Sequence, residues 1–360
     1  ESFARKKGWK ANLLYYFFRL VAKLRIRITA DFFTRLEVRR APARDVLFRR
    51  MCDDYEPALV LTASPGFMKG EAEIIVLAKR NNIPTAAIDF SWDNLSSKAM
   101  RIRKTDYLIV WNSEIKAEAL RIHSYPAERV FVSGSLRFDL YFKDESTDVG
   151  RETFLLSKNL DPKRKTILIS TCSPGVFKGH VEIIRNMLLW EKEGKLSYPV
   201  NILVRLHPKD NADYKEFKHI KNVWIEKGFT RYTFSDKWED GFLEMSTADL
   251  KNMKYTLQHS DVNINCASTV SLEAAAMDMP VINIYVGHYY GRFHYRPIVA
   301  SGAVKLVKEG NELLQAVNRY LAHPEEERTE RRELTKRYIE FTDGKSYERN
   351  VAVIKKLLAA

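Results

Sequence analysis

Short apolar stretches alternate with amphipathic ones from residue 57 onward. Strands are predicted at ALVLTA (58–63), TAAIDF (85–90), YLIVW (107–111) and VFVSG (130–134), with helices near 71–81 and from residue 113. This alternation is typical of a parallel sheet whose strands are joined by crossover helices. We therefore predict an N-terminal Rossmann-like domain over residues 57–145.

A second alternation follows a charged stretch, 139–165, which we interpret as a linker. Strands are expected at 166–171, 200–206, 223–225, 262–266 and 281–286, and helices near 180–193, 211–219, 247–258 and 269–277. This is again the pattern of a doubly wound parallel sheet. We predict a C-terminal Rossmann-like domain over residues 160–325 that binds a nucleotide, followed by helices in 326–360. The predicted fold class is α/β, with the two domains facing a cleft.

Residues 1–56 have a different pattern. Segment 1–50 holds fourteen Lys and Arg against four Asp and Glu, which accounts for most of the chain's net charge of +13. Apolar residues recur there at helical spacing, with basic residues between them: Leu13, Leu14, Phe17, Phe18, Val21 and Leu24. We predict a basic amphipathic helix that either lies on an anionic membrane surface or packs on the first sheet. Because the chain begins without methionine and its first strand comes late, we expect it to be a fragment.

Cysteine usage and hydropathy favour a cytoplasmic protein. Cys52, Cys172 and Cys266 are odd in number and far apart, and by their spacing they form no cluster with histidine. No apolar run approaches the roughly 18 residues of a membrane-spanning helix, and no signal-peptide pattern opens the chain. Asp-x-Asp and Walker-type motifs are absent as well, so we predict no metal and no cofactor. Lipid binding by residues 1–50 would make the protein peripheral on the inner face of the cytoplasmic membrane.

The stretch DVNINCASTVSLEAAAMDMPVINI (261–284) places hydroxyl residues between a strand and a helix. Ser268 and Thr269 can bind an anion there or cap the helix, whose free N–H groups favour phosphate. Glu273 lies one turn into the same helix, where its carboxylate could accept hydrogen bonds from ribose hydroxyls or remain a solvated first-turn acid.

Two further loops leave strands of the same predicted sheet. ILVRLHPKD (202–210) delivers Arg205, His207 and Lys209 to the carboxyl end of a strand, where ligands of open parallel sheets bind. His207 could also protonate a departing phosphate, or could simply bond to backbone. The loop TCSPGVFKG (171–179) offers Ser173 and backbone amides to phosphate, or forms an ordinary turn.

Together these stretches resemble the donor site of GT-B glycosyltransferases. ILVRLHPKD resembles the His-Pro motif of capsule, sialic-acid, Kdo and glycerol-phosphate transferases, and RVFVSGSLRFD (129–139) resembles the end of the first domain in Kdo-transferase-like proteins. The resemblance implies that the serine and threonine hydroxyls hold phosphate, that Glu273 holds ribose, and that His207 contacts donor phosphate. Retaining members often carry a glutamate at the position of Asn265, so an inverting mechanism is expected. The donor-binding residues are then Ser173, Arg205, His207, Lys209, Ser268, Thr269 and Glu273.

The acceptor side is predicted at two loops of the first domain. ASPGFMKGE provides Ser64 and Gly66 after one strand, and DFSWDNLSSK provides Trp92 and Asn94 after the next. Inverting transfer requires a base for the acceptor hydroxyl, and Asp93 or Asp89 is the candidate. The alternative is an Asp-Asn turn in which Trp92 only packs.

The sequence therefore predicts a glycosyltransferase that moves a sugar from a nucleotide-sugar donor to a surface-glycan or lipid-linked acceptor. Transfer of a polyol phosphate from a CDP-polyol is a close alternative, and a nucleotide-sugar epimerase on the same fold is another. A nucleic-acid partner is not expected, because the basic charge is confined to one segment and no RNA- or DNA-binding motif occurs. Donor base, acceptor and oligomeric state are not predicted.

Overall fold

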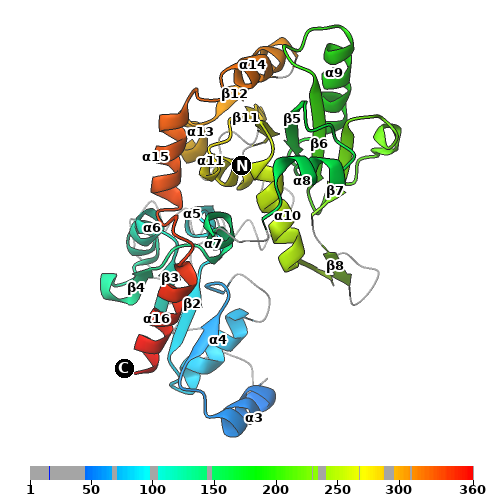
Figure 1. Ribbon diagram of the computed structural model, residues 1–360. Helices are drawn as coiled ribbons and strands as arrows, with labels where there is room; N and C mark the ends of the chain where they lie inside the picture. Colours follow the sequence, from blue (N-terminus) through cyan, green and yellow to red (C-terminus); the bar gives the residue numbers. More distant parts are fainter. Residues whose placement is uncertain are drawn as a thin grey trace. The chain divides into compact units, whose positions relative to one another are not determined.

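The computed structural model describes residues 16, 45–66, 71–97, 104–143, 148–228, 230–233, 241–266, 268–287, 296–308 and 310–359 (Figure 1). The chain divides into two compact units, each made of separate stretches of sequence. Unit 1 comprises 1–89, 99–109 and 118–130, and unit 2 comprises 90–98, 110–117 and 131–360. The predicted boundaries run continuously along the chain, whereas these units interleave.

The first sheet has four strands in the order β1-β2-β3-β4, and β1–β2 and β2–β3 pair in parallel. Its strands are β1 (Val60–Thr62), β2 (Thr85–Ile88), β3 (Tyr107–Val110) and β4 (Val130–Val132). The helices of this part are α3 (Asp45–Tyr55), α4 (Glu71–Arg80), α5 (Asn94–Ser97), α6 (Ser113–His123) and the 3₁₀ turn η1 (Ala127–Arg129). Ala86, Leu108 and Ile109 are fully buried, as expected for strands covered on both faces.

The second sheet has six parallel strands in the order β12-β11-β10-β5-β6-β7 (Figure 1). They are β5 (Lys165–Ser170), β6 (Val200–Leu206), β7 (Val223–Lys227), β10 (Val262–Asn265), β11 (Val281–Ile284) and β12 (Lys305–Val307). From β5 the chain builds the sheet first toward β7 and then, from β10, in the other direction. The switch point of this sheet therefore lies between β5 and β10.

Helices complete the second unit. They are α7 (Leu136–Phe142), α8 (Arg151–Ser157), α9 (His180–Lys192), α10 (Thr247–Gln258), α11 (Val270–Ala276), α13 (Arg296–Val299), α14 (Asn311–Ala322), α15 (Arg328–Tyr338) and α16 (Ser346–Leu358). The core joins the strands to α9 and α14, with Ile167, Ile183 and Val317 among its buried members. Each such side chain contributes about 1.5–3 kcal/mol on burial. Two parallel sheets with interleaved helices confirm the predicted α/β class.

The C-terminal helices are integral to unit 2 and do not form a separate appendage. Arg331 of α15 is 1% exposed and donates from Nε and Nη2 to Oδ1 of Asp278, at 3.1 and 2.9 Å, just beyond α11. At the start of α16, the N–H groups of Ser346 and Tyr347 donate to the carboxylate of Asp139, each at 2.9 Å. These bonds tie α15 to the end of α11 and α16 to α7.

Two local predictions are wrong, and two strands were not predicted. The helix expected over 211–219 is only the 3₁₀ turn η2 (Lys215–Phe217), because Asp210 and Asp213 accept backbone N–H bonds two residues on and so compete with helix formation. The expected linker 139–165 contains α8, whose Phe154 and Leu155 are buried. The antiparallel strands β8 (Thr230–Thr233) and β9 (Gly241–Glu244) were not expected.

The predicted basic helix of residues 1–50 falls outside the described residues, apart from residue 16 and the beginning of α3. Within the part that the structure describes, no helix combines the length and the apolar character needed to cross a bilayer.

Candidate functional site

The carboxyl ends of three neighbouring strands gather most of the predicted donor residues of unit 2. β10, β5 and β6 are adjacent and parallel, so the residues that follow them meet at one edge of the sheet. The loop after β5 contains Ser173, the loop after β6 contains His207 and Lys209, and the turn after β10 leads to Ser268. The switch point of an open α/β sheet is where ligands bind, which is the location predicted from the sequence.

Two hydrogen bonds, each donated by a backbone N–H to a side-chain atom, hold His207. Its own N–H donates to Oγ1 of Thr171 at 2.8 Å, and the N–H of Lys209 donates to its Nδ1 at 3.0 Å. Because Nδ1 accepts, the proton of the neutral ring resides on Nε2. Burial, followed by the charge of Lys209, lowers the pKa of His207 from its ordinary value. The ring is therefore neutral near pH 7 and presents an N–H donor.

Arg205 already has a protein partner. Its Nη1 lies 2.9 Å from Oε1 of Glu226, and its Nη2 donates to the carbonyl of Gly228 at 3.3 Å. The same carboxylate binds Nζ of Lys158 at 2.5 Å, and all three charged side chains are at most 9% exposed. Burial alone would raise the pKa of Glu226, but Lys158 and then Arg205 lower it overall. The guanidinium that was predicted to bind phosphate is thus engaged in a buried ion-pair cluster.

Asn265 organises the turn between β10 and α11. Its Oδ1 accepts from the N–H of Ser268 and from the hydroxyl of Ser271, both at 3.1 Å. The hydroxyl oxygen of Ser268 accepts from the N–H of Val270 at 3.2 Å, while Thr269 makes no capping bond with its side chain. Ser268 therefore has the capping role that was the alternative to anion binding.

Glu273 is fully buried and paired with Arg137 of α7. Oε1 of Glu273 lies 2.5 Å from Nη2 of Arg137, whose side chain is 38% exposed. The carboxylate raises the pKa of Arg137, outweighing the opposite effect of burial. The carboxylate predicted to bind ribose is thus engaged by a side chain of α7. Arg137 was not among the predicted site residues, although it lies within RVFVSGSLRFD.

Of the residues predicted for the acceptor side, Ser64 and Asp89 are fully buried. Ser64 donates its backbone N–H and its hydroxyl to the carboxylate of Glu71, at 3.1 Å for the N–H. Gly66 is half-buried with φ of 82°, a conformation that favours glycine. Ser64 thus secures the start of α4, and neither Ser64 nor Asp89 is open to an acceptor.

The second acceptor loop is mostly packed as well. Trp92 is 5% exposed and meets Tyr338 edge-on with ring centroids 5.6 Å apart, and Asn94 is buried. Asp93 is half-buried and accepts from the hydroxyls of Ser91 and Ser97, at 2.6 and 2.9 Å. The predicted acceptor contacts of Trp92 and Asn94 are therefore not available, and Asp93 is the more accessible of the two candidate bases.

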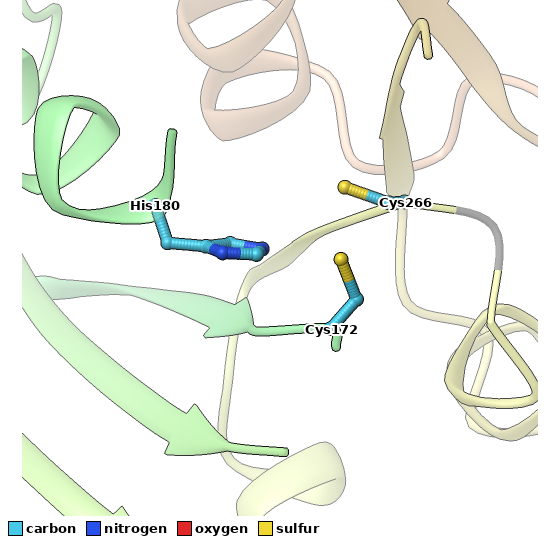
Figure 2. Close-up of side chains that lie close together, drawn as sticks. All are labelled: Cys172, His180 and Cys266. Carbon is cyan, nitrogen blue, oxygen red and sulfur yellow. The ribbon is translucent and has the colours of Figure 1, made fainter. Parts of the chain in front are cut away.

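A cluster of cysteine and histidine lies at the switch point, contrary to the prediction that the cysteines form none. The ligand atoms of Cys172, His180 and Cys266 lie within 4.8 Å of one another, and Figure 2 shows the three side chains turned toward a common point. A hydrogen bond with Cys266 lowers the pKa of Cys172 to about 6, against the effect of burial and with a further contribution from His180. Spacing along the chain could not reveal a cluster that depends on β5 and β10 being neighbours.

The two doubly wound sheets define a GT-B-like fold. The chain belongs to the CDP-glycerol:poly(glycerophosphate) glycerophosphotransferase family, whose model matches residues 80–356. The predicted GT-B transferase of surface-polymer synthesis is thereby confirmed. No curated protein matches the chain in sequence.

Solved structures with the same fold include both transferases and epimerases. The wall teichoic acid polymerase TagF is 12% identical with a TM-score of 0.53, covering 98% of this chain and 99% of that one. UDP-GlcNAc 2-epimerase from Neisseria meningitidis, bound to UDP-GlcNAc, is 16% identical with a TM-score of 0.55, covering 87% and 80%. The S. aureus MnaA–UDP complex is 14% identical with a TM-score of 0.54, covering 93% and 81%. At these identities the likeness establishes the fold alone.

Proposed function

We propose that the protein transfers a polyol phosphate, such as glycerol phosphate, from a CDP-linked donor to a hydroxyl at the end of a cell-surface polymer. The acceptor oxygen forms a bond to the phosphorus that bears the polyol, the pyrophosphate bond breaks, CMP leaves and the hydroxyl proton passes to a base. The family match supports this alternative over the sugar transfer that the sequence analysis put first, because its description specifies a CDP-glycerol donor.

The observation that carries the proposal is the hydrogen bonding of His207. Its Nδ1 is occupied by the N–H of Lys209, so Nε2–H is the remaining donor. A neutral ring with a fixed donor can hold a pyrophosphate oxygen and stabilise the charge that develops on departing CMP. Since the pKa of His207 is lowered, we assign it hydrogen bonding rather than proton transfer as its principal role.

The remaining donor contacts are proposed from groups at the same edge. Lys209 is exposed beside His207 and supplies positive charge. The loop with Ser173 follows β5, and Thr269 with its hydroxyl lies between β10 and α11. Arg137, which pairs with Glu273 but has a side chain that is 38% exposed, adds a further cation next to α11. Arg205 is left out of this set because Glu226 and Gly228 already satisfy it.

Asp93 is the proposed base for the acceptor hydroxyl. Two serine hydroxyls orient its carboxylate, which leaves lone pairs free to accept the proton of the attacking group. Asp89 is excluded from this role by its complete burial.

Product analysis tests the proposal. The protein is incubated with CDP-glycerol and a poly(glycerophosphate) primer, and the released nucleotide is identified. Polyol-phosphate transfer releases CMP and lengthens the primer by a phosphodiester, whereas sugar transfer lengthens an acceptor by a glycosidic bond, with release of a nucleoside diphosphate from a nucleoside-diphosphate sugar or of CMP from a CMP-sugar. His207→Gln should lower CMP release by about 100-fold, the effect typical of losing one transition-state donor. The exposed His219 provides a control, His219→Gln, with unchanged activity. Release of a nucleoside diphosphate from a nucleotide sugar, with no CMP from CDP-glycerol, would refute the proposal.

A further inference from the structure

Three potential metal ligands converge at the switch point of the second sheet. Cys172 follows β5, Cys266 follows β10 directly, and His180 is the first residue of α9. The two strands pair in parallel, so both cysteines emerge at the same edge, and the loop 171–179 returns to place His180 beside them. One nitrogen and two sulfur atoms thus come together from three separate elements (Figure 2).

The cluster is enclosed, and one nitrogen of the His180 ring has no hydrogen-bond partner among the described residues. Cys172, His180 and Cys266 are 7%, 4% and 3% exposed. Among the described residues, Nε2 of His180 has no hydrogen-bond partner, and the ring is packed edge-on against Phe177 with centroids 5.0 Å apart. Buried polar atoms normally have partners, so a ring nitrogen without one, in an imidazole that faces two thiols, requires an explanation.

We propose that Cys172, His180 and Cys266 bind a zinc ion. Two thiolates and one imidazole are a ligand set that zinc uses in proteins, and three protein ligands leave one tetrahedral position open. Usual zinc–sulfur and zinc–nitrogen bond lengths put the ligand atoms about 3.5–3.8 Å apart. The present separations, all within 4.8 Å, require only small side-chain rotations to reach that geometry.

Binding needs no oxidant. Each thiol releases its proton to solvent as a sulfur–zinc bond forms, and His180 coordinates as the neutral ring. The ion would fix the start of α9 to the ends of β5 and β10, in the loop that also contains Ser173. This inference replaces the prediction from sequence that the chain holds no metal, and it does not depend on the proposed transfer reaction.

Cobalt(II), which can replace zinc and is coloured when bound by thiolates, is the probe for the first test. The protein is reduced with a phosphine, freed of metal with a chelator and titrated with cobalt and then zinc. The parent should bind one cobalt with a thiolate-to-cobalt absorption band that zinc abolishes. Cys172→Ser and Cys266→Ser should each weaken zinc binding by more than the ~10–100-fold that loss of an outer-shell partner costs. Cys52, in α3 outside the cluster, gives the matched control Cys52→Ser with unchanged binding.

A second test needs no variant and so avoids a failure to fold. Zinc should protect Cys172 and Cys266 of the parent from alkylation, and leave the reactivity of Cys52 unchanged. The proposal is overturned if the reduced parent binds no stoichiometric cobalt, or if binding survives in both Cys172→Ser and Cys266→Ser. It is equally overturned if the two thiols form a disulfide in air while the reduced protein binds neither metal, since the cluster would then be a redox pair.

Discussion

Replacing Glu226 should destabilise unit 2 far more than replacing an exposed glutamate. Its carboxylate accepts from Lys158 at 2.5 Å and Arg205 at 2.9 Å, and also from Asn252 and Trp224 at 2.8 and 3.1 Å. Glu226→Gln keeps the volume of the side chain but leaves two cations, each at most 9% exposed, without a counter-charge. Breaking a buried pair in this way costs about 3–5 kcal/mol. Because the amide oxygen of the glutamine can still accept one hydrogen bond, we expect a loss of stability at the lower end of this range, about 3 kcal/mol.

The assay is urea unfolding followed by tryptophan fluorescence, to which Trp224 beside Glu226 contributes. Glu216→Gln is the control, because Glu216 pairs with Arg185 at a similar distance, 2.7 Å, but the two side chains are 45% and 52% exposed. Solvent screening makes such surface pairs weak, so Glu216→Gln should lose only a small part of the stability that Glu226→Gln loses. Equal losses in the two variants would refute the reasoning that burial of the cluster gives Glu226 its importance.

The difference in stability between the parent and Glu226→Gln should change with pH in one direction only. The pKa of Glu226 is lowered in the folded protein, so the folded state retains the charged form to lower pH than the unfolded state does. Its stabilising contribution is fully present above the unfolded value of about 4.3 and is lost as pH falls through the folded value. The gap between the parent and Glu226→Gln should therefore be constant near neutral pH and shrink in acid. A gap that widens as pH falls would contradict the ion-pair account.

Three further predictions concern other parts of unit 2. Gly134→Ala should lower stability by at least about 1 kcal/mol in thermal unfolding, because φ is 85° there and the new Cβ would clash with the side chain of Ser346. An unchanged midpoint would contradict this geometry. Asp139→Ala should cost about 1 kcal/mol in the same assay, since it removes the acceptors for two N–H groups of α16, whereas Asp139→Asn should recover only part of this stability, because the two N–H groups bind different carboxylate oxygens and an amide can accept only one of the bonds. Asp93→Asn should reduce CMP release at least about 100-fold, because it removes the proposed base. Nucleotide binding, measured by calorimetry, should be unchanged. A loss of binding that parallels the loss of CMP release would assign Asp93 a structural role.

The two sheets could be predicted from sequence because their strands are short stretches rich in apolar residues. In β6, for example, Ile202, Leu203 and Val204 form a buried apolar run, and amphipathic helices are predicted on either side of the strand. The position of His207 followed from the same reasoning, since a loop that leaves such a strand must begin at the carboxyl edge of the sheet.

Partners across the sheet could not be predicted, because they depend on strand order and register. Arg205 is opposite Glu226 in the β6–β7 register, and nothing in VWIEK marks its glutamate as a buried counter-ion. Cys172 and Cys266 are neighbours only because β10, far along the chain, returns to pair with β5. Spacing along the sequence identifies metal sites formed within one segment, but it does not identify sites assembled by crossover connections.

Nucleotide binding at the carboxyl edge of the second sheet is the central claim, and thermal unfolding with CMP, CDP and UDP tests it most directly. A nucleotide at about 100 times its dissociation constant should stabilise the folded protein by roughly 2.7 kcal/mol. The account predicts this stabilisation with CMP and CDP for the parent and for His219→Gln, a weaker effect of UDP, and loss of the effect in His207→Gln. It would be contradicted if cytidine nucleotides left the parent unchanged, or if they stabilised His207→Gln as strongly as the parent.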